Sequence, residues 1–264
     1  MEKIYKYIED HASTPNEALE WVVKQTHIRT NHARMLSGAI QGQLLRMLVQ
    51  MTGATRILEL GTFTGYSAIC LASALPEGGH LDTLELNDEL EDLILGGFER
   101  AGVADKIDLM IGDCKQTLLR LREEMGLTTC TANASAGAGD GESTGANEGR
   151  TANEGRTADE GRTAGEGRTA GEGADAHMLY DIVYIDANKR EYCEYYDLVF
   201  DMIRPGGLIL ADNVIWDGKV CQDPLPQDKQ TQSIVRFNDM VSADPRVESV
   251  IIPLRDGLNV IRKK

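Results

Sequence analysis

The chain has 264 residues, of which 42% are apolar, and it carries a formal net charge of −15. This length suits one α/β domain with a complete core. The negative charge disfavours broad binding to nucleic acid or to an anionic membrane surface. No apolar stretch approaches the roughly 20 residues needed to cross a bilayer, and the first ten residues are too charged for a signal peptide. We therefore expect a cytoplasmic protein.

The cysteines agree with a reducing compartment. There are five of them, widely spaced and without a C-x-x-C pair. A disulfide framework or a structural zinc site normally shows an even number or a paired spacing. The sequence therefore predicts reduced thiols at Cys70, Cys114, Cys130, Cys193 and Cys221.

Taken in chain order, the N-terminal region is predicted to be helical. Thr14, Pro15 and Glu17 form a capping-box pattern with proline at the first helical position. A second helix is expected from about Ser37 to Gly53, where apolar residues recur every three or four positions.

From residue 56 onward, short apolar strands alternate with amphipathic helices. Strands are predicted at 56–60, 80–86, 107–112, 180–185 and 207–211, and helices at 65–75, up to 102, up to 125 and at 190–203. The chain ends with a helix at 233–241 and two strands, 247–254 and 258–262, joined by Asp256-Gly257.

This alternation predicts an α/β fold with a doubly wound, Rossmann-like sheet of seven strands. Continuous apolar strands are typical of a parallel sheet that helices cover on both faces. The tight Asp256-Gly257 turn makes the last strand pair antiparallel and puts one reversed strand at the end of the sheet. Such a sheet is typical of class I methyltransferases.

Residues 126–177 differ in composition from the rest of the chain, and we call them the insert. They are dominated by Gly, Ala, Thr, Glu and Arg and contain a hexapeptide repeat that begins at Ala146. A left-handed β-helix with this period needs a bulky aliphatic side chain in each turn, which the repeat lacks. Ordering the backbone costs about 1 to 2 kcal/mol per residue, and the insert has too little apolar surface to offset this cost by burial. We expect a disordered insert without a catalytic role, within a single domain spanning residues 1–264.

The turn after the first predicted strand favours one cofactor. A dinucleotide fingerprint needs a glycine two residues after Gly61, so that the backbone can approach a pyrophosphate, and this position is Phe63. Glu59, near the end of the strand, would repel a diphosphate and attract a cationic ligand. S-adenosylmethionine, which carries an ammonium and a sulfonium, fits this turn.

Acidic residues also follow the next two strands. Glu85 stands where a carboxylate accepts hydrogen bonds from a ribose diol, and Asp113 could hold the adenine amino group. One such residue is a weak signal, but three in order at successive strand ends favour S-adenosylmethionine. The predicted cofactor-binding residues are Ser37, Glu59, Gly61, Thr62, Gly65, Tyr66, Ser67, Glu85, Asp113, Cys114 and Asp186.

Four strings resemble the metal-dependent O-methyltransferases, which include caffeoyl-CoA and catechol O-methyltransferases and their bacterial relatives. They are Met35-Leu36-Ser37 with Gln41-Gly42-Gln43, GTFTGYSA from Gly61, Asp186-Ala187-Asn188-Lys189, and Ala211-Asp212-Asn213 followed by Trp216-Asp217-Gly218. The resemblance covers essentially the whole chain except the insert. It implies that Asp186, Asp212 and Asn213 hold Mg²⁺ or another divalent cation, that Lys189 is the general base, and that the protein is a homodimer.

The residues themselves also favour a metal site. Asp186 closes the strand at 180–185, and Asp212-Asn213 closes the strand at 207–211. Neighbouring strands lie about 4.8 Å apart, so these two ends can converge on one ion. Three oxygen ligands suit a hard octahedral cation that keeps positions open for substrate oxygens. The alternative is that Asp212-Asn213 only opens a turn.

The predicted reaction is methyl transfer to a hydroxyl of a small vicinal-diol, catechol-like aromatic molecule, with Lys189 and Asp186 as catalytic residues. Trp216 either stacks on the acceptor ring or anchors its own loop. The relative that methylates catechols has histidine after the first metal aspartate, where this chain has Ala187. Two alternatives remain open: a methyltransferase of tRNA hydroxyuridine, which the acidic balance disfavours, and a non-catalytic module that binds S-adenosylmethionine.

Overall fold

The computed structural model describes residues 2–13, 15–127 and 178–264. The chain divides into two compact units, one of Met1–Thr129 with Ala174–Lys264 and the other of Cys130–Gly173. The second unit and nearly all of the insert lie outside the described residues, so the expectation for the insert stays a prediction.

The described part of the first unit alternates helices and strands, as expected. Its strands are β1 (Arg56–Leu60), β2 (His80–Glu85), β3 (Ile107–Ile111), β4 (Tyr180–Ile185), β5 (Ile203–Asp212), β6 (Val247–Ile252) and β7 (Leu258–Lys263). Its α-helices are α1 (Glu2–Asp10), α2 (Glu17–Arg29), α3 (Ala39–Thr52), α4 (Tyr66–Ala72), α5 (Glu91–Ala101), α6 (Cys114–Glu124), α7 (Tyr192–Phe200) and α8 (Lys229–Ala243). Short 3-10 helices are η1 (Ala33–Met35), η2 (Asp88–Leu90), η3 (Ala104–Lys106), η5 (Lys189–Glu191) and η6 (Lys219–Cys221).

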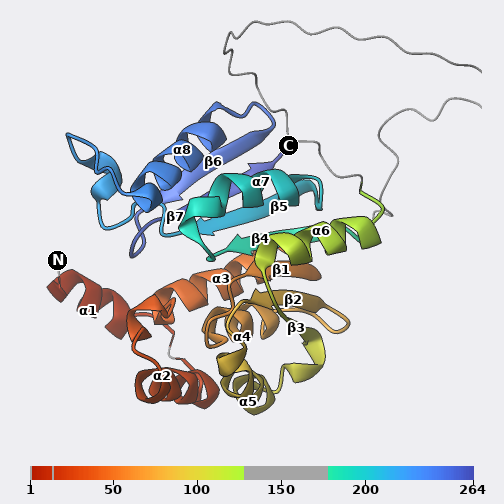
Figure 1. Cartoon of the computed structure of the whole chain (residues 1–264). Helices are drawn as coiled ribbons and strands as arrows, with labels where there is room; N and C mark the ends of the chain where they lie inside the picture. Colours follow the sequence, from red (N-terminus) through yellow and green to blue (C-terminus); the bar gives the residue numbers. More distant parts are fainter. Residues whose placement is uncertain (1, 14, 128–177) are drawn as a thin grey trace, which may run out of the picture. The chain divides into compact units, whose positions relative to one another are not determined.

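The seven strands form one sheet in the order β3-β2-β1-β4-β5-β7-β6 (Figure 1). The pairs among β1 to β5 are parallel, and β7 is antiparallel to both of its neighbours. This confirms the predicted fold class. The reversed strand, however, lies between β5 and β6 and not at the edge. Leu258 and Ile261 of β7 are fully buried, whereas Val250 of β6 is 59% exposed, so the inner strand is the more buried one although β6 carries more apolar residues.

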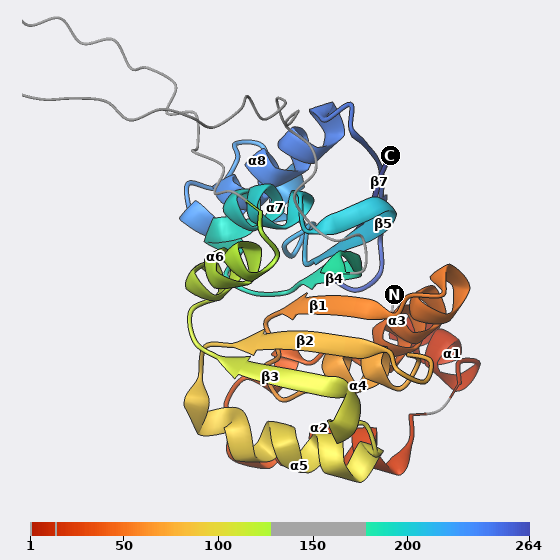
Figure 2. The ribbon, with the colours of Figure 1, turned by 90° about the vertical axis from the view of Figure 1, so that its right-hand side faces the viewer.

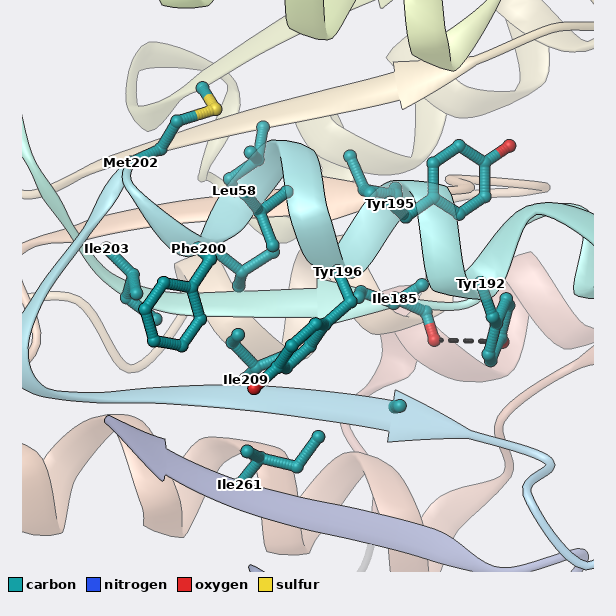
Figure 3. Packing of buried hydrophobic residues seen from close by; sticks show 14 of the residues in the cluster. Leu58, Ile185, Tyr192, Tyr195, Tyr196, Phe200, Met202, Ile203, Ile209 and Ile261 are labelled. Carbon is teal, nitrogen blue, oxygen red and sulfur yellow. Dashed lines mark hydrogen bonds between the residues drawn. The ribbon is translucent and has the colours of Figure 1, made fainter. Parts of the chain in front are cut away.

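Helices cover both faces of this sheet (Figure 2). Side chains of α2 to α5 share one buried cluster with one face, and side chains of α6, α7 and α8 share another with the opposite face. Figure 3 shows Tyr196 and Phe200 of α7 packed against Ile209 of β5. Burying each such side chain contributes roughly 1.5–3 kcal/mol. None of the described helices is long and apolar enough to cross a membrane.

Several predicted boundaries are wrong: α8 begins at Lys229 and not at 233, α4 ends at Ala72 and not at 75, and α7 ends at Phe200 and not at 203. Two others have a clear local reason. The capping-box prediction placed the first turn of α2 at Pro15, but the helix begins at Glu17, and Asn16 Oδ1 accepts from Leu19 N at 2.9 Å. Asparagine caps at least as well as threonine, so the cap moves two residues along. Strand β5 begins at Ile203 and not at 207, because Ile203 already pairs with Tyr180 before the register shifts.

Candidate active site

The carboxyl ends of β1 and β4 lie side by side, where the strand order reverses, with Leu60 paired to Ile185. Open α/β sheets bind their ligands at this point. A shallow cleft opens here. Its lining residues are Met35, Leu36, Ser37, Gly61, Thr62, Phe63, Thr64, Tyr66, Ser67 and Asp186. Six of these are predicted cofactor-binding residues, so residues far apart in sequence form a single wall.

Gly61 allows the two strand ends to approach. Its φ is +96°, a conformation that favours glycine, and its N–H donates to Leu84 O at 3.0 Å. A Cβ at this position would collide with the backbone carbonyl of Asp186. Asp186 N in turn donates to Leu60 O at 2.8 Å. Gly61 therefore allows the turn that follows β1 to lie directly against Asp186.

Glu85 does not line the cleft, but accepts hydrogen bonds that stabilise the turn after β1. Its Oε2 accepts from Phe63 N at 2.6 Å, and its Oε1 accepts from Asn87 N at 2.9 Å. Asp113 likewise caps α6, accepting from Gln116 N at 3.0 Å. The predicted contacts of Glu85 and Asp113 with ribose and adenine stay predictions, since these local bonds leave acceptor capacity on both carboxylates.

Three other predicted cofactor residues do not line the cleft. Gly65, with φ +85°, precedes α4, where a Cβ would come within 3.0 Å of Phe98. Cys114 is buried at the start of α6, and burial raises the pKa of its thiol to about 12. Glu59 is fully buried on β1, and burial raises the pKa of its carboxyl to about 7.

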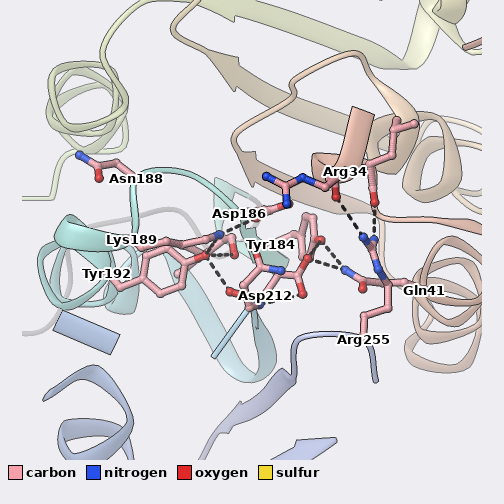
Figure 4. A network of polar contacts seen from close by, with 12 residues as sticks. Arg34, Gln41, Tyr184, Asp186, Asn188, Lys189, Tyr192, Asp212 and Arg255 are labelled. Atoms are coloured by element: carbon pink, nitrogen blue, oxygen red, sulfur yellow. Dashed lines mark hydrogen bonds and ion pairs between the residues drawn. The ribbon is translucent and has the colours of Figure 1, made fainter. Parts of the chain in front are cut away.

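Asp186 and Asp212 occupy equivalent positions at the ends of β4 and β5, because Ile185 pairs with Ala211 (Figure 4). Burial raises the pKa of Asp186, the Lys189 ammonium lowers it, and the nearby charge of Asp212 raises it again. The two carboxylates therefore repel each other, which is the electrostatic arrangement that a bound cation relieves.

Asp212 is held from three sides. It is 1% exposed; its Oδ2 accepts from Gln41 Nε2 at 2.7 Å and from Tyr184 OH at 3.1 Å. Its Oδ1 accepts from Asn213 N at 2.8 Å. Asn213 has φ +61° and so turns the chain immediately after β5.

Lys189 joins this cluster from η5. Its Nζ lies 2.6 Å from Asp186 Oδ1 and 2.6 Å from the hydroxyl oxygen of Tyr192. The Tyr192 hydroxyl donates toward the backbone oxygens of Ile185, at 3.1 Å, and Asp212, at 2.9 Å. Tyr192 thus ties the ends of β4 and β5 to the lysine. Lys189 is 10% exposed, so the predicted base lies beside the first aspartate and not in bulk solvent.

Trp216 lies in the loop beyond β5, with φ +51°. It packs, partly buried, against the core cluster of α7 and α8, and its Nε1 is buried without a hydrogen-bond partner among the described residues. Lys219 Nζ lies 5.8 Å from its ring centre. This packing favours the loop-anchor interpretation, and stacking on an acceptor stays a prediction.

With this geometry in place, comparison with known proteins identifies the family. The model of the O-methyltransferase family matches residues 9–130 and 168–264. The chain belongs to the O-methyltransferase family. Both its predicted class and its predicted use of S-adenosylmethionine are confirmed.

Similar proteins match along almost the whole chain. This O-methyltransferase is 28% identical over 270 residues to caffeoyl-CoA O-methyltransferase 2 of Zea mays and to the protein of that name from Petunia hybrida. The matches cover 98% of this chain and 82% and 90% of those relatives. The O-methyltransferase TomG of Streptomyces achromogenes, solved with SAM, is 25% identical, with a TM-score of 0.73 over 99% of this chain and 96% of that one. The Bacillus cereus O-methyltransferase, solved with SAH, shares the fold at 24% identity, with a TM-score of 0.72 over 99% and 97%.

The sequence assigned no role to several residues that shape this site. Gln41 was part of a matched string, and a polar residue on the buried face of a helix is a signal that marks it. Tyr184 and Tyr192 carry no such signal, because tyrosine on an apolar strand or helix is ordinary core. Arg255, in the turn before β7, donates to the backbone oxygens of Leu36 and Arg34 and thereby fastens one wall of the cleft.

A second cluster of possible metal ligands lies at the opposite end of the sheet. Atoms of His80, Asp82 and Asp108 lie within 4.8 Å of one another near the starts of β2 and β3. Asp82 is already bound by Tyr180 OH at 2.7 Å and by Arg56 at 3.4 Å. The family match provides no reason to place chemistry there.

Proposed function

We propose that this O-methyltransferase uses a divalent cation to methylate a hydroxyl of a small vicinal-diol aromatic molecule. The observation that carries the proposal is the pair of carboxylates, Asp186 and Asp212, at paired strand ends beside the cofactor cleft, with Lys189 in contact with the first. Two acids of like charge at the end of a parallel sheet are costly unless a positive group joins them.

In the proposed cofactor site, Ser37, Gly61, Thr62 and Ser67 surround the methionine end of S-adenosylmethionine, with Glu59 behind them. The cofactor supplies the methyl group from its sulfonium. Tyr66 closes the side of the cleft, and Glu85 and Asp113 extend the site toward the ribose and the adenine. The residues of the cleft orient the cofactor and exclude water, which an in-line displacement requires.

The donor set fits a hard divalent cation. Asp186, Asp212 and Asn213 offer two carboxylates and one amide, the ligand types that Mg²⁺ prefers. Gln41 and Tyr184 orient Asp212, as partners of metal ligands commonly do. A bound cation would supply positive charge to both oxygens of a vicinal diol.

Lys189 is the proposed base. In its uncharged form, Nζ has a lone pair that can take the proton of the acceptor hydroxyl, while Tyr192 fixes the position of the amine. Asp186 stabilises the ammonium that this proton transfer creates, because it lies 2.6 Å away.

A methylation assay with radiolabelled S-adenosylmethionine tests this function. We expect transfer to catechol-type ortho-diols in Mg²⁺, little transfer to the corresponding meta-diols, and loss of transfer after chelation. Transfer that persists in chelator would refute the metal requirement. Labelling of bulk tRNA in place of the diols would favour the tRNA alternative, and the absence of any transfer in the presence of cofactor binding would favour the non-catalytic module.

We also propose that the enzyme is a cytoplasmic homodimer. Support for a dimer comes from apolar side chains on the edge strand β6, where Val250 is 59% and Ile251 41% exposed. Exposed apolar surface of this kind marks association sites. Light scattering coupled to size-exclusion chromatography measures the mass, and a monomeric mass would refute the dimer.

A further inference from the structure

Glu59 and Thr83 lie at paired register positions of β1 and β2. Thr83 Oγ1 is 2.5 Å from Glu59 Oε2, and Thr62 Oγ1 is 2.6 Å from Thr83 Oγ1. Glu59 and Thr83 are fully buried and Thr62 is 2% exposed. Two hydroxyls therefore connect the cofactor turn to a buried carboxylate without intervening solvent.

The chain of hydroxyls has one direction when Glu59 is ionised. A carboxylate only accepts hydrogen bonds, so the single hydrogen of the Thr83 hydroxyl points to Glu59. The oxygen of Thr83 then accepts, and the hydrogen of the Thr62 hydroxyl points to Thr83. Because Thr62 uses its hydroxyl hydrogen in this bond, its oxygen presents only lone pairs to the cleft that it lines.

The other oxygen of this carboxylate is enclosed in the protein and does not reach the cleft. Glu59 Oε1 is buried and has no hydrogen-bond partner in the described part of the chain, although the Ser67 hydroxyl is near enough to lower the pKa of the carboxyl. Buried carboxylate oxygens are costly when they accept nothing. The lone pairs of Thr62, and the negative charge two hydrogen bonds behind it, are both features that a cationic N–H donor in the cleft would satisfy.

We propose that Thr83 is a positioning residue that orients the Thr62 hydroxyl through its own hydrogen bond to Glu59, so that Thr62 Oγ1 accepts from the ammonium group of the cofactor and the Glu59 carboxylate stabilises that charge from behind. The inference rests on the cofactor site proposed above. It assigns Thr83, which never touches the cofactor, a role in recognising the amino-acid end of that molecule.

The other titratable groups around Glu59 do not supply this function. They are Glu85 on β2, Asp186 and Tyr184 on β4, and Cys70 on α4. The carboxylates among them raise the pKa of Glu59 by repulsion. The stabilisation of the charged form comes instead from the hydroxyls of Ser67 and Thr83.

Calorimetric titration of the full chain with two probes tests the role of Thr83. S-adenosylhomocysteine carries the ammonium group, and 5′-methylthioadenosine lacks the amino-acid end. We expect Thr83→Val, which keeps the shape and removes the donor, to weaken S-adenosylhomocysteine binding about tenfold, as loss of a charge-assisted hydrogen bond does. Binding of 5′-methylthioadenosine should change less than about twofold.

Thr83→Ser and Thr83→Cys complete the series. Serine restores the donor and should return the affinity for S-adenosylhomocysteine to within about twofold of wild type. The thiol of cysteine is a weaker donor, so the affinity of Thr83→Cys should lie between those of the serine and valine variants. This ranking also tests the inference if Thr83→Val folds poorly. Equal weakening of both probes, or affinity that does not follow donor strength, would overturn the role of Thr83 alone. Failure of the wild-type chain to bind S-adenosylhomocysteine would overturn the proposed cofactor site, and the role of Thr83 with it.

Discussion

Lys189 Nζ lies 2.6 Å from Asp186 Oδ1, so the proposed base and a proposed metal ligand form an ion pair. They are three positions apart in sequence, and the short η5 helix brings the lysine back over the end of β4. The pair is 10% and 19% exposed, so it is screened far less than a surface ion pair. This contact would couple the position of the proposed base to the state of the proposed metal site.

Replacing Lys189 separates catalysis from binding. We expect Lys189→Met to keep the affinity for S-adenosylhomocysteine within about threefold and to lower kcat by about 100-fold or more, which is the usual contribution of a general base. Lys229→Met, at the exposed start of α8, is the matched control. An unchanged kcat in Lys189→Met would remove this residue from the mechanism.

Gln41 should tune the metal site from outside it. Gln41→Leu removes the 2.7 Å hydrogen bond to Asp212 Oδ2 and leaves Tyr184 to orient that oxygen. Loss of such a partner typically weakens metal binding about 10- to 100-fold. Titration with Mn²⁺, followed by electron paramagnetic resonance, measures this directly. Gln43→Leu, two residues along the same helix, should bind Mn²⁺ as wild type does. Equal affinities in the two variants would show that Gln41 does not support the site, and failure of the wild-type chain to bind Mn²⁺ would contradict the proposed metal site.

Gly61→Ala should damage both stability and cofactor binding. The residue has φ +96°, and a Cβ would collide with the carbonyl of Asp186. We expect a loss of about 2 to 4 kcal/mol in the free energy of unfolding, from backbone strain and overpacking together. Gly78→Ala is the control, because Gly78 has φ +76° with open space around it. It should lose about 1 kcal/mol, so similar losses would show that the contact with Asp186 is unimportant.

The stability of the cofactor-free enzyme should depend on the charge of Glu59. Burial raises the pKa of this carboxyl from 4.5 to about 7. The folded chain therefore binds the proton more tightly than the unfolded chain, so this stabilisation is complete below about pH 4.5 and is lost as the pH rises to about 7. The change corresponds to about 3 kcal/mol.

Urea unfolding of wild type and Glu59→Gln at pH 5 and pH 8 measures this difference. The variant has no charge to bury, so wild type should lose about 2.5 kcal/mol more than the variant over this interval. Glu77→Gln, at an exposed position, should follow wild type. Parallel losses in wild type and Glu59→Gln would show that Glu59 does not titrate in this range.

The sequence predicted the local elements well where apolar patterning decides them. Strand β1 covers residues 56–60 and β4 covers 180–185, as expected, because a continuous apolar run has one stable place, inside a covered sheet. The helix expected to end at Gly53 does so, since glycine adopts the left-handed cap at φ +63°. Asp186 and Asp212 could be placed at strand ends for the same reason.

Tertiary structure decided the features that depend on neighbours far apart in the chain. The position of β7 between β5 and β6 is set by long-range strand pairing, and local composition does not predict it, because the edge strand β6 has four apolar residues and β7 has three. The contacts of Gln41 with Asp212 and of Thr83 with Glu59 join residues 171 and 24 positions apart. Sequence alone thus determined the fold class and the residue types of the site, because periodicity and turn chemistry are local. The hydrogen-bond partners that position those residues arise only when distant strands and helices pack together.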